Sequence, residues 1–145
     1  MSFVEVSLVR NQLRTALERS RAKAQLRRQR ASGAEQAWIE FLERVAVPLA
    51  RQVSNALKVE GYAFTVFTPS QGLRLASDHG RDDFIELVLD TTGEQPQVLG
   101  RVSRVRGSRT LSDERPVKPG ASPADISEQE LLTFFLDALE PWLER

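Results

Sequence analysis

The side chains that could do chemistry in this sequence are one histidine, many carboxylates and two groups of arginines. His79 is the only histidine, and it lies beside Asp78 within the acidic stretch of residues 78–83. An imidazole and a carboxylate could form an acid–base pair, and clustered oxygens could hold a cation. The stretch lacks the ligand spacings of zinc and calcium loops, however, and consists mostly of turn-forming residues. We therefore interpret it as a hairpin turn and expect neither a metal ion nor a cofactor.

No catalytic motif stands out elsewhere. The chain contains no cysteine, which excludes thiol catalysis and thiolate metal sites. It has neither the glycine-rich phosphate loop nor the G-x-S-x-G motif of serine hydrolases. Carboxylates are plentiful, but no spacing singles out a pair for acid–base work. We predict a protein that is not an enzyme. The enzyme alternative requires a concave pocket with perturbed carboxylates near residues 78–86.

The first arginine group lies near the N-terminus, in a segment from residue 3 to about residue 30 that favours a helix. At 100° per residue its arginines form a row beside an apolar side that contains two leucines. The segment carries few acids, so the row predicts a surface that binds an acidic protein partner. The candidate partner-binding residues are Arg10, Leu13, Arg14, Leu17, Arg21 and Arg28.

The second group is a possible anion-binding site, because no acid interrupts residues 101–110. Its members are Arg101, Arg104, Arg106 and Arg109. Both groups together could bind the phosphates of a nucleic acid, and this is the main alternative function. Against it, the net charge is zero, no DNA- or RNA-binding motif is present, and neither group contains aromatic side chains to stack on bases. A membrane-surface role is disfavoured because the basic helix lacks a dense apolar face.

Two helical segments must position the first group. Ser32 and Glu35 match a capping box, which predicts that a second helix starts there. An apolar stripe from Trp38 to Leu57 follows, with an expected kink at residues 44–47 before Pro48 and an end at Gly61. The alternative is one helix, because a four–three spacing runs from Leu13 to Val45, as in a coiled coil. We favour the break, which divides the chain into a basic helical arm (1–31) and a core domain (32–145).

The middle of the chain favours β-strands over residues 62–68, 73–77, 84–90 and 97–106, separated by short turns. A further edge strand is possible at residues 110–117. Short connections favour antiparallel pairing. A second capping box, Ser127 and Glu130, predicts a C-terminal helix. The predicted fold is α+β: an antiparallel meander sheet of four to five strands, with a long N-terminal helical region and a C-terminal helix.

These elements predict a function in protein–protein interaction. The 145 residues suit one globular domain. Lack of cysteine, of a signal-peptide pattern and of a long apolar run favours the cytoplasm. A helix longer than the sheet can cover predicts a homodimer formed through the N-terminal helices. The expected class is therefore a homodimeric adaptor, a chaperone-like protein or an assembly subunit.

Overall fold

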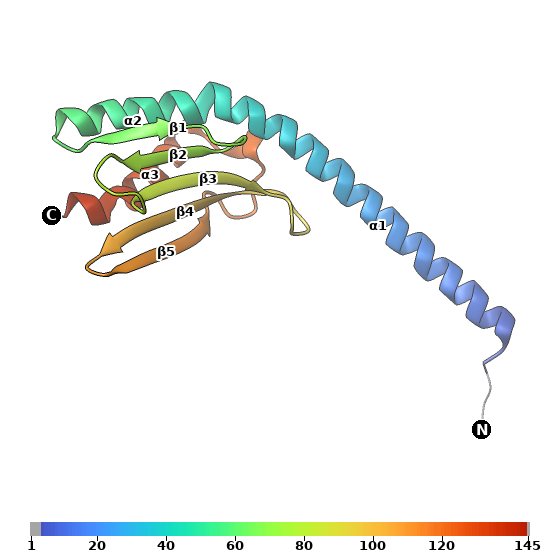
Figure 1. The fold of residues 1–145 in the computed structure, drawn as a ribbon. Helices are drawn as coiled ribbons and strands as arrows, with labels where there is room; N and C mark the ends of the chain where they lie inside the picture. The colour runs from blue at the N-terminus through green and yellow to red at the C-terminus, as the bar shows by residue number, and fades with distance from the viewer. Residues whose placement is uncertain (1–3, 145) are drawn as a thin grey trace.

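The computed structural model describes residues 4–144 and has an α+β fold. A 54-residue N-terminal helix leads into a five-stranded antiparallel sheet, and a C-terminal helix completes the chain (Figure 1). The elements are α1 (Val6–Phe41), the π-helical turn η1 (Leu42–Ala46), α2 (Val47–Val59), β1 (Phe64–Phe67), β2 (Leu73–Ser77), β3 (Phe84–Asp90), β4 (Gln97–Arg106), β5 (Arg109–Pro116), the 3₁₀ turn η2 (Pro123–Asp125) and α3 (Glu128–Leu143).

The predicted break at Ser32 is wrong, because α1 runs through it without interruption. The capping box competes with an uninterrupted ladder of helical hydrogen bonds on both sides of Ser32. Gly33 disfavours a helix by only about 1 kcal/mol relative to alanine. The contacts of Ala34 and Trp38, both buried, hold the helix in place immediately after the glycine. The alternative of one helix, predicted from the four–three spacing, is therefore correct.

The irregularity expected before Pro48 is present as the π-helical turn η1. Proline has no N–H to donate and crowds the carbonyl four residues earlier, so the preceding turn cannot remain regular. The chain widens there, and the Val47 N–H donates to the Leu42 carbonyl, five residues back. The N-terminal helix ends as predicted at Gly61, which has a positive φ of 91°. The Tyr62 N–H then donates to the Leu57 carbonyl and closes the last turn.

The sheet is a meander in the order β1-β2-β3-β4-β5. Strands β2, β3 and β4 have the predicted bounds, β1 is shorter than predicted, and the fifth edge strand is formed. Side chains alternate between two faces. One face packs against the helices and contributes Leu73, Leu75, Ile85, Leu87 and Val98 to the core. Helices α2 and α3 cover this face, whereas α1 runs beyond the sheet (Figure 1).

Helix α3 is anchored by its cap and by a close approach to β4. The predicted capping box is formed: the Glu130 N–H donates to the Ser127 hydroxyl, and the Ser127 N–H donates to the Glu130 carboxylate. The Phe134 ring lies over Gly100, where a β-carbon would come within 2.0 Å of it. In the part of the chain described here, no helix is long and apolar enough to cross a membrane.

Candidate functional site

The N-terminal part of α1 extends away from the sheet and the other helices (Figure 1). Every residue from 6 to 23 is exposed, and we call this part the projecting segment. A helix of 18 residues is about 27 Å long. Helices in proteins gain most of their stability from the packing of an apolar face. A segment of this length with no packed face is therefore a candidate for binding another molecule.

The face that would bind is defined by the apolar seam of α1. Towards the C-terminal end of α1 the seam packs into the core, where Trp38 is 2% exposed and Ala34 is 8% exposed. The same seam continues in phase along the projecting segment, where Leu13 is 58% exposed and Leu17 is 45% exposed. Between these two ends the seam positions hold only small or polar residues, which are Ser20, Ala24, Arg27 and Ala31. The large apolar side chains of the seam thus form part of the core at one end and are uncovered at the other.

The predicted arginine row is formed beside this uncovered stripe. Arg10, Arg14, Arg21 and Arg28 are all exposed, and the continuous helix places them on one side of the rod. Among residues 4–144, none of the four makes a salt bridge. Their charges are therefore available to a partner. The structure brings together the six candidate partner-binding residues on adjoining sides of one helix.

The second arginine group is not one cluster. Arg101 lies on the open face of the sheet, whereas Arg104 and Arg106 are at even positions of the same strand and so lie on the opposite face. Arg109 pairs in register with Arg106 across the β4–β5 hairpin and shares that face. A single anion site built from all four side chains is not formed.

Arg101 belongs to a row of alternating charges across four strands. The register aligns Arg74, Glu86, Arg101 and Glu114 on β2, β3, β4 and β5. Arg74 donates to Glu86 over 2.6 and 2.9 Å, and Arg101 Nε donates to Glu114 over 2.7 Å. Arg101 also lies 3.6 Å from the Glu86 carboxylate. Its charge is therefore compensated within the sheet.

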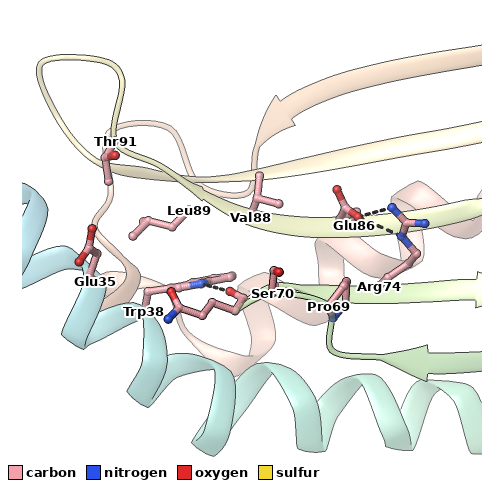
Figure 2. Close-up of a pocket in the computed structure, with 11 residues that line it drawn as sticks. Glu35, Trp38, Pro69, Ser70, Arg74, Glu86, Val88, Leu89 and Thr91 are labelled. Carbon is pink, nitrogen blue, oxygen red and sulfur yellow. Dashed lines mark hydrogen bonds and ion pairs between the residues drawn. The ribbon is translucent and has the colours of Figure 1, made fainter.

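A pocket of about 430 Å³ lies between α1 and the β1–β2 turn (Figure 2). Ser70 and Gln71 form this turn with positive φ values of 35° and 62°, a conformation that costs non-glycine residues energy. The Trp38 indole N–H holds the turn by donating to the Gln71 carbonyl over 2.6 Å. The enzyme alternative requires a pocket with perturbed carboxylates near residues 78–86. The lining of this pocket includes Glu86, which is hydrogen-bonded to Arg74.

The histidine stretch forms a turn, as predicted, because residues 78–83 connect β2 to β3. The His79 N–H donates to the Ser77 hydroxyl within this turn. Neither His79 nor Asp78 lines the pocket of Figure 2. Over residues 4–144, no three acids or histidines are arranged to hold a metal ion.

An apolar groove between α2 and α3 was not predicted. Its volume is about 490 Å³, and leucines of α3 spaced along one side of the helix form one wall. Leu136 is 51% exposed and Leu143 is 39% exposed, so this side of α3 is partly uncovered. The buried side of α3 includes Phe134, which packs over Gly100. The groove depends on the relative placement of two distant helices, which no local pattern specifies.

Comparison with known proteins gives no match to a family model, to a curated protein or to a solved structure.

Proposed function

We propose that the chain is a non-enzymatic protein–protein interaction module, a homodimeric adaptor, chaperone-like protein or assembly subunit that associates through its N-terminal helix. The supporting observation is the stripe that is core at Trp38 and uncovered at Leu13 and Leu17. A cytoplasmic location, expected from the composition, belongs to the same proposal.

The energetics favour a partner along this stripe. Val6, Val9, Leu13 and Leu17 are each between 45% and 69% exposed. Full burial of one such side chain contributes about 1.5–3 kcal/mol. Covering the exposed part of all four therefore contributes on the order of 3–6 kcal/mol, before the entropic cost of association. The adjoining arginine row directs the segment towards an acidic surface and raises the association rate at low salt.

The test compares two leucines that differ in the face they occupy. Leu17 is 45% exposed on the stripe, and Leu8 is 47% exposed on a different side of α1. We expect the wild type to be a dimer by light scattering after size exclusion. Leu17→Glu should be monomeric at concentrations where Leu8→Glu is still dimeric. A monomeric wild type, or equal dissociation of both variants, would contradict the proposal.

The second candidate function is nucleic-acid binding, favoured by the exposed and unpaired row of Arg10, Arg14, Arg21 and Arg28 within the described chain. Phosphate contacts would give an affinity that falls steeply with salt. Absorbance at 260 and 280 nm in the same size-exclusion run detects bound nucleic acid. Excess absorbance at 260 nm that disappears in high salt, and that Arg10→Gln with Arg14→Gln reduces, would favour this candidate.

A further inference from the structure

The groove between α2 and α3 has the properties of a helix-binding site. Its α3 wall carries Leu132, Leu136, Leu139 and Leu143, a spacing that keeps apolar side chains along one side of the helix. Its other wall contains Val53 and Leu57 of α2, and the groove is open to solvent, as the exposure of Leu136 shows. An amphipathic helix in an apolar groove is a common mode of protein recognition.

The charges around the groove are negative. By helical position, Glu128 and Glu140 of α3 flank the leucine wall, whereas Asp137 lies on the far side of the helix. The helix has no basic residue between Glu128 and Leu143, and its remaining acid, Glu130, is paired with Lys118. The α2 wall ends at Glu60, and of the described residues that line the groove none is basic. A helix that fits this groove should have an apolar stripe flanked by basic side chains.

The projecting segment has that chemistry. Residues 6–23 contain five basic residues and one acid, Glu18. Their apolar stripe extends over 11 residue steps from Val6 to Leu17, and the leucine wall extends over the same number of steps from Leu132 to Leu143. Both distances are about 16 Å along a helix. The segment and the groove therefore match in length, polarity and charge.

The segment cannot occupy the groove of its own chain. Leu13 and Leu57 belong to one continuous rod and are separated by 44 residues, about 66 Å of helix. Bringing them together would require the helix to break. The groove of a second copy has no such restriction, and a twofold arrangement lets each copy fill the groove of the other.

Direct pairing of two projecting segments side by side is disfavoured. By heptad position, Arg14, Arg21 and Arg28 lie on one flank of the seam through Leu13 and Leu17, and Lys23 lies on the other. In a parallel coiled coil Lys23 of one copy would face Arg28 of the second copy, so like charges would meet. The acidic groove replaces this repulsion with attraction.

From these observations we propose that the projecting segment of one copy lies in the α2–α3 groove of a second copy, reciprocally, as a twofold dimer. The inference rests on the proposed homodimer and specifies which surface the segment contacts. Its apolar residues Leu13 and Leu17 face the leucine wall, while Arg10, Arg14 and Arg21 approach the acids of α3. Association is therefore weakened by salt and by changes at either surface.

The first experiment changes the groove and leaves the segment intact. Leu136→Glu should raise the dimer dissociation constant at least about 10-fold, equivalent to about 1.4 kcal/mol, measured by sedimentation equilibrium. Ala56→Glu, at an exposed position on the α2 wall, should do the same. Leu111→Glu is the matched control, because Leu111 is an exposed leucine on β5, outside the groove. The dimer dissociation constant of this variant should be within about twofold of the wild type.

The second experiment mixes two defective variants. Leu17→Glu retains an intact groove, and Leu136→Glu retains an intact segment, so an equimolar mixture should form heterodimers with one segment–groove contact although each variant alone is monomeric. One outcome would overturn the groove assignment while preserving the proposed function: the wild type is a dimer, Leu17→Glu dissociates it, and neither Leu136→Glu nor Ala56→Glu changes its dissociation constant. A monomeric wild type would overturn both.

Discussion

Gly100 offers a direct test of how α3 is seated on the sheet. A β-carbon at this position would lie 2.0 Å from Phe134 Cζ and 2.7 and 2.8 Å from Cε1 and Cε2. Favourable carbon–carbon contacts are about 3.5–4.0 Å, so Gly100→Ala requires the ring to move by about 1.5 Å or more. Phe134 is only 5% exposed, and the Arg115 guanidinium lies 5.1 Å from its ring centroid. The ring therefore has little space to move into.

Overpacking of this kind costs about 1–3 kcal/mol of stability. In a domain of this size the expected fall in Tm is about 3–10 °C. Urea unfolding followed by circular dichroism measures the free energy directly. Gly93→Ala is the matched control, because its new β-carbon would meet only the Gln95 carbonyl, at 3.8 Å, and we expect a change within about 0.5 kcal/mol.

A double-mutant cycle separates this steric effect from the backbone effect of replacing glycine. Phe134→Ala alone should cost about 3–5 kcal/mol, because it leaves a cavity. In that background Gly100→Ala should cost nothing or restore some stability, giving a coupling energy of about 1–3 kcal/mol. Equal costs of Gly100→Ala with and without the Phe134 ring would refute the packing argument.

Two further predictions concern the ends of the chain. Deletion of residues 1–31 should leave a folded core, because the first buried side chain of the rod is Ala34, and loss of the folded circular dichroism spectrum would show that the N-terminal helix is structural. The Ser127 backbone N–H, followed by the hydrogen bond from Lys118, lowers the pKa of Glu130. The stabilising contribution of the ionised Glu130 carboxylate is therefore complete above the ordinary glutamate pKa and is lost as the pH falls through the lowered pKa. Glu130→Gln should lower the free energy of unfolding at neutral pH and approach the wild type in acid. A difference in unfolding free energy that does not change with pH would contradict this.

The sheet was predictable because its information is local. Alternating apolar residues are separated by short turns at residues 78–83 and 91–96, and these fix both the strand bounds and the antiparallel order. Helix α3 was predictable for the same reason, since the Ser127 capping box states where it begins. The continuity of α1 was harder to predict, because two local patterns compete: the capping box at Ser32 favours a break, and the four–three spacing favours one helix. The structure has the single helix, with Trp38 buried in the core just after the expected break.

The candidate sites divide along the same line. The row from Arg10 to Arg28 follows from helical periodicity alone. The grouping of Arg101 with Arg104 and Arg106 failed because proximity in a strand does not place residues on one face, and the odd and even positions already carried that information. The groove beside Leu136 and the pocket beside Trp38 arise only when distant elements meet, so no local pattern indicates them.

The uninterrupted helix has a consequence for how the protein can change over time. The uncovered residues and the buried residues of the stripe belong to one continuous helix. The insertion of a single residue between Ala24 and Ala31 would therefore rotate Leu13 by about 100° relative to the sheet and shift it by about 1.5 Å. An insertion of seven residues would return it to within about 20° of its original direction. The length of this helix therefore sets the direction in which Leu13 and the rest of the uncovered stripe face, as well as their distance from the sheet.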